Sequence, residues 1–144
     1  MVKIETENIK LYKGDCLEVM DRLIKQGVKV DAIITDPPYG TTACKWDSVI
    51  PFEDMWDRLN KLVKDTTPIL LFNTEPFGSF LRCSNIKKYK HDLIWDKNIG
   101  GAFVLANKRM LPSHENISVF YSKQPTYNPI KELKDKKDKK AHQK

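Results

Sequence analysis

Apolar residues recur along this chain with two different spacings, and the two spacings alternate. Leu17, Met20, Leu23 and Ile24 follow one another at positions i, i+3, i+6 and i+7, which places them on one face of a helix. Short apolar runs rich in β-branched residues lie between the helical stretches and are typical of buried strands. The pattern predicts, in order, a strand at residues 9–15, a helix at 16–27, a buried strand at 30–36, a helix at 51–65, a buried strand at 68–73, a helix at 75–89, and strands at 91–97 and 116–122.

The order of these elements predicts an α/β fold. Strands and helices alternate over the first 90 residues, which favours a parallel sheet with helices on its faces. No helical pattern separates the last two strands, so we expect them to form an antiparallel pair at one edge. A long loop over residues 98–115 joins them.

Polar residues stand at the carboxyl ends of the predicted strands, where open α/β sheets bind their ligands. These ends read Gly14-Asp15, Asp36-Pro37-Pro38-Tyr39, Asn73-Thr74-Glu75 and Asp96-Lys97. The second is unusual, because prolines cannot continue a strand that is paired on both sides.

The tetrapeptide Asp36-Pro37-Pro38-Tyr39 combines stiffness with hydrogen-bond acceptors. Each proline fixes φ near about −65° and lacks an N–H, and the residue before a proline is held extended. The Asp36 carboxylate and the backbone carbonyls can accept hydrogen bonds, and an exposed Tyr39 ring can stack on a flat ligand. The segment therefore predicts a slot for a planar group that carries an amine, such as a nucleobase. Stacking of about 1–3 kcal/mol per base would help to hold that base outside a duplex.

Charge and cysteine content narrow the partners and the compartment. The net charge is +6, but residues 131–144 hold seven lysines and three acidic residues, so four of the six charges fall there. This tract predicts either a solvated, disordered end or a segment that binds nucleic-acid phosphates. No apolar run is long enough to cross a membrane, and the charged beginning lacks the apolar centre of a signal peptide. Cys16, Cys44 and Cys83 match no zinc or disulfide pattern, so we expect free thiols in a reducing cytoplasm.

The tetrapeptide and its surroundings resemble a known family. "TDPPYG" after a buried strand resembles the catalytic motif of the amino-methylating DNA methyltransferases, which transfer a methyl group from S-adenosylmethionine to adenine N6 or cytosine N4. "LYKGDCLEVMDRL" before it resembles the beginning of those members in which the catalytic motif precedes the cofactor motif. "LIWDKNIGGAFVLANKRMLPSHENISVFYSKQPTYNP" resembles their later part, so the resemblance covers residues 9–129.

The resemblance implies a Rossmann-like, S-adenosylmethionine-dependent methyltransferase sheet that acts on double-stranded DNA. Asp36 and the Pro37 carbonyl would accept hydrogen bonds from the target amine, Pro38 would belong to the same catalytic segment, and Tyr39 would stack on the flipped base. Asp15 would lie near the adenine part of the cofactor, with Asp36 and Pro37 also at the cofactor site. An aspartate at position 36, where many cytosine-N4 enzymes have serine, favours adenine N6. Residues 1–130 would form the catalytic part and residues 131–144 a lysine-rich tail.

One expected part of the family pattern is missing from the sequence. The Gly-rich cofactor motif, of the form Asp/Asn-Pro-Phe-x-Gly-Ser-Gly, is not formed by any of the six glycines. In the family sheet the strands that carry it lie between the first predicted strand and the strand ending at Asp36. We therefore expect an incomplete sheet with partly uncovered hydrophobic faces, in a truncated or split enzyme that lacks a C-terminal half or second subunit. The alternatives are a catalytically inactive remnant that binds DNA or a partner half, and methylation of RNA or of protein amides.

Several candidate residues also have simpler structural interpretations. Asp15 has the residue type and position of a helix N-cap, a role compatible with cofactor binding. Trp95, inside an apolar run, is expected in the core, whereas Trp46 in a polar loop has base or cofactor contact as an equal alternative.

The long loop supplies the remaining candidates. Lys97, Lys108 and Arg109 are expected to contact DNA phosphates, with a solvated loop as the alternative. His114-Glu115 has no second spaced histidine, so no metal site is predicted.

Overall fold

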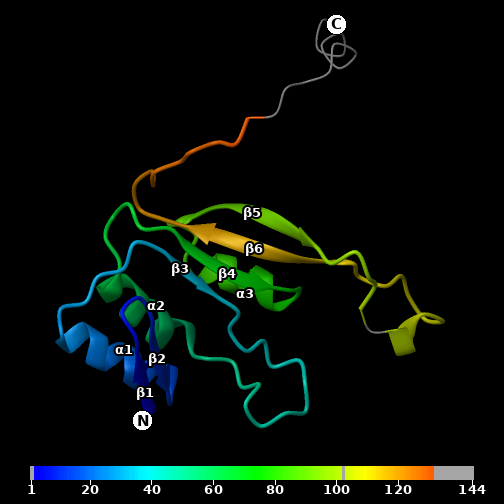
Figure 1. Cartoon of the computed structure of the whole chain (residues 1–144). Coiled ribbons are helices and arrows are strands. Elements are labelled where there is room, and N and C mark those ends of the chain that lie inside the picture. The colour runs from blue at the N-terminus through cyan, green and yellow to red at the C-terminus, as the bar shows by residue number, and fades with distance from the viewer. Residues whose placement is uncertain (1, 102, 132–144) are drawn as a thin grey trace, which may run out of the picture.

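A computed structural model describes residues 2–101 and 103–131 of the chain (Figure 1). Its strands are β1 (Val2–Glu5), β2 (Lys10–Lys13), β3 (Ile33–Thr35), β4 (Ile69–Asn73), β5 (Tyr89–Asp96) and β6 (His114–Phe120). Its helices are α1 (Cys16–Lys25), α2 (Phe52–Leu62) and α3 (Phe77–Ser84), with a short 3-10 turn at Phe103–Leu105. Among the described residues, no helix has the length and hydrophobicity needed to cross a lipid bilayer.

The main sheet has four strands in the order β3-β4-β6-β5. β3 runs parallel to β4, whereas β6 is antiparallel to both of its neighbours. The predicted antiparallel pairing of the last two strands is thus confirmed, and β6 lies between β4 and β5. The carboxyl ends of β3, β4 and β5 meet at one edge of the sheet, because these three strands share one direction.

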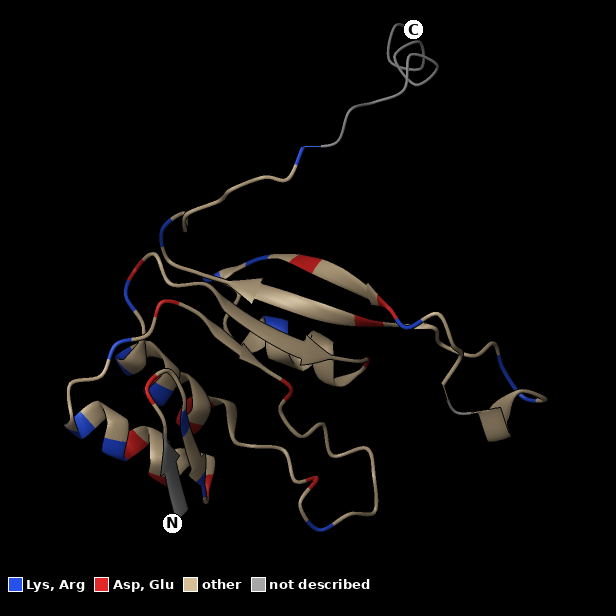
Figure 2. Ribbon diagram, viewed as in Figure 1, with Lys and Arg blue, Asp and Glu red and all other residues tan. Residues whose placement is uncertain are grey.

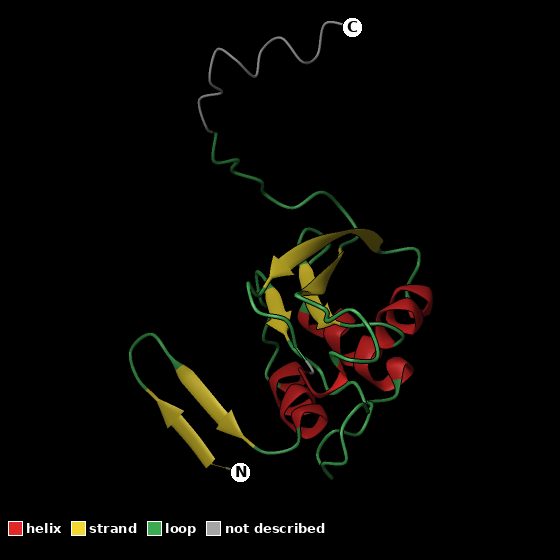
Figure 3. Cartoon of the chain, turned by 90° about the vertical axis from the view of Figure 1, so that its right-hand side faces the viewer, coloured by secondary structure: helices red, strands yellow, loops and turns green. Residues whose placement is uncertain are grey.

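The hydrophobic core lies between one face of this sheet and the helices α2 and α3 (Figure 3). Alternate residues of β4, Ile69 and Leu71, point into it, as the period of two requires. Trp56 of α2 packs on Phe120 of β6, with ring centroids 4.9 Å apart, and Leu81 of α3 is fully buried. Helix α1 packs against α2 and adds Met20 to the edge of the core.

The local signals at α1 work as the sequence predicts. The Asp15 carboxylate accepts hydrogen bonds from the backbone N–H of Leu17 at 2.8 Å and of Glu18 at 3.2 Å, so Asp15 is the N-cap. Gly27 ends the helical segment with φ of 70°, a left-handed conformation that favours glycine.

The predicted strand at 9–15 does not join the main sheet. Its central part, β2, pairs antiparallel with β1 in a hairpin that stands apart from the four-stranded sheet (Figure 3). The assumption that this strand is parallel to the others was therefore wrong. The physical reason is that no described strand lies between the hairpin and β3, so backbone pairing cannot link them.

The second face of the sheet is not covered by any described helix. It carries the apolar side chains of Ile34, Leu70, Phe72, Leu93, Trp95, Ile117 and Val119. Few charged residues interrupt the four strands, whereas the helices and the connections carry many (Figure 2). The expectation of a partly uncovered hydrophobic sheet is confirmed.

Two sequence predictions fail on this uncovered face. The strand ending at Asp36 was expected to be buried, but Ile34 is 66% exposed, because β3 is an edge strand with one open face. Trp95 was expected in the core, but it is 46% exposed and contacts Phe72 edge-to-face, with ring centroids 5.6 Å apart. The three cysteines are free, as predicted, and all three are exposed.

Candidate active site

The tetrapeptide after β3 lines a cavity of about 260 Å³ at the end of the sheet where β3, β4 and β5 have their carboxyl ends. Its walls are formed by residues 36–39 and 41–42 of one short segment and by residues 46–47 of another. Asp36, Pro37, Pro38 and Tyr39 therefore lie with Trp46 on the walls of one cavity, and their contacts with a base or cofactor stay predictions. We call this cavity the slot.

Within the slot, the Tyr39 hydroxyl donates a hydrogen bond to the Asp36 carboxylate. Burial, followed by this bond, raises the pKa of Tyr39, so the hydroxyl stays a donor at neutral pH. The Tyr39 ring is half-buried rather than exposed, because it packs on Phe77 of α3 with ring centroids 5.1 Å apart. This contact fixes the ring plane against the core, and Pro37 of the same segment is buried.

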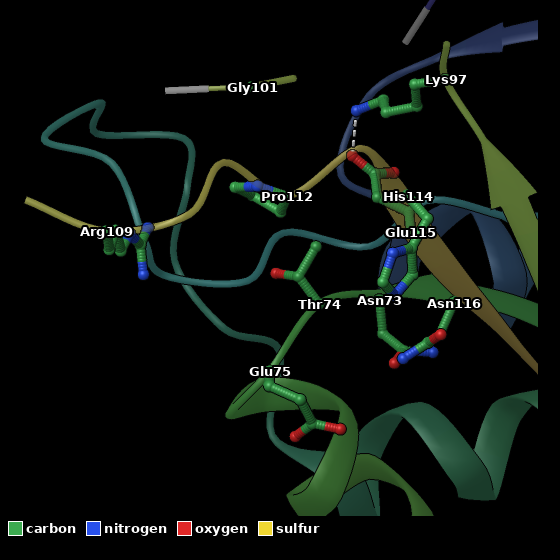
Figure 4. A pocket seen from close by; sticks show the side chains of 10 residues that line it. All are labelled: Asn73, Thr74, Glu75, Lys97, Gly101, Arg109, Pro112, His114, Glu115 and Asn116. Atoms are coloured by element: carbon green, nitrogen blue, oxygen red, sulfur yellow. Dashed lines mark hydrogen bonds and ion pairs between the residues drawn. The ribbon is translucent and has the colours of Figure 1, made fainter. Parts of the chain in front are cut away.

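A second cavity of about 410 Å³ lies at the same edge of the sheet, between the end of β4, the start of β6 and the β5–β6 loop (Figure 4). Lys97 and Arg109 both line it, and the Lys97 ammonium pairs with the Glu115 carboxylate. Figure 4 shows this ion pair at one end of the cavity and Arg109 at the other. After burial and the Asp36 carboxylate, the Glu115 charge is the smallest contribution to the raised pKa of Tyr39.

A polar network lies beneath the second cavity. Asn73, which has no exposed surface, donates to the Ser118 hydroxyl at 3.0 Å and to the Leu71 carbonyl at 3.0 Å. Ser118 in turn donates to Asp92 at 2.6 Å. These bonds satisfy the buried polar groups where β4, β6 and β5 run side by side.

Arg82 of α3 connects this network to the rim of the cavity. Its guanidinium contacts Asp92 at 3.5 Å and pairs with Glu75. The Ser79 hydroxyl, followed by the Arg82 guanidinium, holds the pKa of the Glu75 carboxyl below its usual range. Side chains of β4, β5, β6 and α3 therefore hold one another in place beneath the second cavity.

Two sequence candidates stand outside both cavities. Asp15 caps α1 and lines neither the slot nor the second cavity. Lys108 lies in the β5–β6 loop, which extends away from the sheet (Figure 1), and it lines neither cavity. Among the described residues, no group of three or more histidine, cysteine, aspartate or glutamate side chains could hold a metal ion. The lysine-rich tail beyond residue 131 lies outside the described residues.

One residue of the slot was missed by the sequence analysis. Asp47 is 8% exposed, and its carboxylate accepts hydrogen bonds from three backbone N–H groups of the loop that follows Tyr39. The sequence gives no periodic or motif signal for this role, because the contact joins residues five to seven positions apart in an irregular loop.

Comparison with known proteins identifies the family. The family model N6_N4_Mtase, described as DNA methylase, matches residues 30–144, and the chain belongs to this DNA methylase family. Two solved structures, titled the M1.HpyAVI–SAM complex and M1.HpyAVI, share the fold at 23% and 24% identity, with TM-scores of 0.65 and 0.63. Each match covers 86% of this chain, and the chain spans 62% of the length of each of these structures. No curated protein matches significantly.

The slot contains the groups needed to hold an amine. Asp36 and the backbone carbonyls of the two prolines are acceptors only, which suits an N–H₂ group rather than an anion. For S-adenosylmethionine, the slot offers Asp36 and Pro37 as one wall, but the free edge of β3 next to it is paired with no described strand. The described residues therefore supply acceptors suited to an amine and leave the side of the slot next to the free edge of β3 without a pairing strand.

Proposed function

We propose that this chain is the catalytic part of a DNA methyltransferase that methylates an exocyclic base amine, with adenine N6 favoured over cytosine N4. The observation that carries the proposal is the slot itself: Asp36 and Tyr39 are joined in one cavity after a strand of a DNA methylase fold. Asp36 at the first position supports adenine N6. The target base would be flipped out of the duplex and stacked beside Tyr39.

In this proposal Asp36 and Pro37 act on the amine through hydrogen bonds. An aromatic amine is a poor nucleophile, because its lone pair is delocalised into the ring. Acceptance of its two N–H groups by the Asp36 carboxylate and the Pro37 carbonyl draws the nitrogen toward tetrahedral geometry and makes the lone pair available. S-adenosylmethionine would supply an electrophilic methyl group, whose bond to sulfur breaks with the electron pair kept by sulfur. Asp36 is the acceptor placed to take the proton that the amine then loses.

The bond between Tyr39 and Asp36 is compatible with this role. A carboxylate has two oxygens and about four acceptor positions, so Asp36 can bond to the Tyr39 hydroxyl and to an amine at once. The hydroxyl would hold the carboxylate in place while Phe77 holds the Tyr39 ring. The second cavity, with Lys97 and Arg109, would contact phosphates next to the flipped base.

A further polypeptide segment is part of the proposal. The chain spans 62% of the length of the similar structures, and both the free edge of β3 and one apolar face of the sheet are open. We infer that a missing half, in the same chain or in a second subunit, completes the sheet at this edge and supplies the rest of the cofactor site. Asp15 would approach the cofactor only in that complete assembly.

Methyl transfer is the decisive measurement. The chain is incubated with tritium-labelled S-adenosylmethionine and unmethylated double-stranded DNA, alone and together with the polypeptide encoded by the DNA that follows the codon of residue 144. We expect transfer only in the combined sample, loss of transfer in Asp36→Ala, and retention in Asp57→Asn, an exposed residue paired only with Lys61 among the described residues. Circular dichroism checks that both variants fold.

The alternatives predict different outcomes. Full transfer by Asp36→Ala would refute the role of the slot. Transfer by the chain alone would refute the need for a further segment. Absence of transfer in every combination would favour the inactive remnant, whose remaining property would be binding to DNA or to a partner half.

A further inference from the structure

The loop between β3 and α2 has few regular backbone hydrogen bonds, yet every residue that lines the slot belongs to it. Figure 1 shows this loop extending from the sheet beyond the end of β3. Tyr39 and Ile50 pack against the core near the two ends of this loop, but Trp46 between them is 74% exposed, so its own side chain is not held by the core. Something else must hold Trp46 and Tyr39 on the walls of one cavity.

The Asp47 carboxylate is the group that closes this loop. One of its oxygens accepts from the Gly40 backbone N–H at 2.8 Å. The other accepts from Thr41 N–H at 2.8 Å and from Thr42 N–H at 2.6 Å. In return the Asp47 N–H donates to the Cys44 carbonyl at 3.0 Å. Hydrogen bonds to an ionised acceptor are stronger than neutral ones, so one side chain replaces the regular pairing that the loop lacks.

The backbone at Gly40 is shaped for this closure. Its φ is 69°, a left-handed conformation, and a Cβ atom there would lie 2.9 Å from the Val49 side chain. The turn directs three consecutive N–H groups toward one point, and Asp47 occupies that point. The Thr42 side chain, followed by these N–H groups, lowers the pKa of Asp47 to about 2, so the acceptor stays ionised under ordinary conditions.

The position of these contacts in the chain links them to the slot. Gly40 directly follows Tyr39, and Asp47 directly follows Trp46. The hydrogen bond from Gly40 to Asp47 therefore ties together the two residues next to the two aromatic side chains of the slot. If this hydrogen bond breaks, Tyr39 and Trp46 are no longer held close together through their neighbours Gly40 and Asp47.

We propose that Asp47 is a positioning residue that holds the Gly40–Asp47 loop closed, so that Tyr39 and Trp46 line one slot for a planar base. Its effect on methyl transfer rests on the proposed function, whereas its effect on the loop does not. Asp47 acts through the backbone and through its neighbours, and it is not assigned a contact with the reacting amine.

The test compares Asp47→Asn with Asp57→Asn, a matched charge removal at an exposed position. Amide hydrogen exchange is measured by NMR on the whole chain at Gly40, Thr41 and Thr42, with buried Leu71 of β4 as an internal reference. In Asp47→Asn we expect exchange at the three loop amides to rise roughly 10- to 100-fold, the range for losing hydrogen bonds to a charged group, and the indole N–H signal of Trp46 to shift. Leu71 should exchange as in the wild type.

A second variant covers the case in which Asp47→Asn folds poorly. Asp47→Glu keeps an ionised carboxylate with both oxygens, displaced by one methylene group, and we expect it to raise exchange at the loop amides by less than Asp47→Asn does. Unchanged exchange at Gly40, Thr41 and Thr42 in the folded variants would overturn the proposal, as would an equal effect of Asp57→Asn.

Activity provides an independent measure and separates the two proposals. In a preparation that transfers methyl groups, Asp47→Asn should lower kcat by about 10- to 100-fold, as for a misplaced reacting group, with a smaller change in KM for S-adenosylmethionine. An unchanged kcat with an opened loop would refute the positioning role. If the wild type transfers nothing while Asp47→Asn still opens the loop, the proposed function fails and the structural role of Asp47 stands.

Discussion

Gly78 is the residue whose replacement tests the packing beneath the second cavity most directly. It lies at the start of α3, where the helix crosses Asn73 at the end of β4. A Cβ atom at position 78 would lie 2.1 Å from Oδ1 and 3.0 Å from Cγ of Asn73, and 3.0 Å from the Arg82 guanidinium. Arg82 can move its side-chain end, but Asn73 is held by two hydrogen bonds to Leu71 and Ser118.

Two opposing effects decide the result of Gly78→Ala. Alanine in a helix is more favourable than glycine by at most about 1 kcal/mol. Overpacking against Asn73 costs about 1–3 kcal/mol, and leaving a buried amide unsatisfied costs about 1–3 kcal/mol more. The unfavourable effects are larger, so we expect Gly78→Ala to lower the free energy of unfolding by about 1–5 kcal/mol.

The assay is urea unfolding of four proteins: wild type, Gly78→Ala, Asn73→Ala and the double variant. Asn73→Ala removes both of the Asn73 atoms that the new methyl group would contact. In that background Gly78→Ala should stabilise the protein by a few tenths to about 1 kcal/mol, because only the helix preference remains. A reversal of sign between the two backgrounds is the expected signature. Equal destabilisation in both backgrounds, or none in either, would refute this account of the α3–β4 contact.

Two further predictions concern the open face and the slot loop. Ile34→Lys should change the free energy of unfolding of the chain by no more than about 0.5 kcal/mol, yet prevent activation by the completing segment. Ile86→Lys, equally exposed but outside the open sheet face, should leave activation intact, and an equal effect of both variants would contradict the assignment of this face. Because the folded-state pKa of Asp47 is about 2, below its ordinary 3.8, the stabilisation of the loop by its ionised form is complete above pH 3.8 and disappears as the pH falls toward 2. Amide signals of Gly40, Thr41 and Thr42 should report this transition, and loss of loop order near pH 5 would contradict it.

Local patterns predicted the parts of the molecule that depend on neighbours in sequence. The N-cap at Asp15 and the helical stripe of α1 follow from short-range rules, and both are confirmed. The slot was also predictable, because two prolines fix the backbone of residues 36–39 without help from distant residues. The role of Asp47 was not, since an irregular loop turned it toward three N–H groups that no sequence period places.

Burial was the property that the sequence predicted least well. Apolar runs containing Ile34 and Trp95 were assigned to the interior, although both residues lie on the open face. An apolar run shows that a strand face would be stable when buried. It does not show whether another element of the chain packs on that face. The hairpin of β1 and β2 shows the same limit, because a strand pattern does not specify its partner.

The place of β6 between β4 and β5 has a consequence for the order in which the protein can assemble during synthesis. β6 is the last strand of the described chain, and its fully buried Phe120 joins Trp56 and Tyr89, which are translated long before it. Until residue 120 has left the ribosome, β4 and β5 have no central partner and the helices have no finished core. We therefore expect ribosome-bound chains ending near residue 113 to remain sensitive to protease, and chains extended well beyond residue 120 to become resistant in a single late step. Gradual protection, gained strand by strand, would show that the earlier elements fold without their central strand.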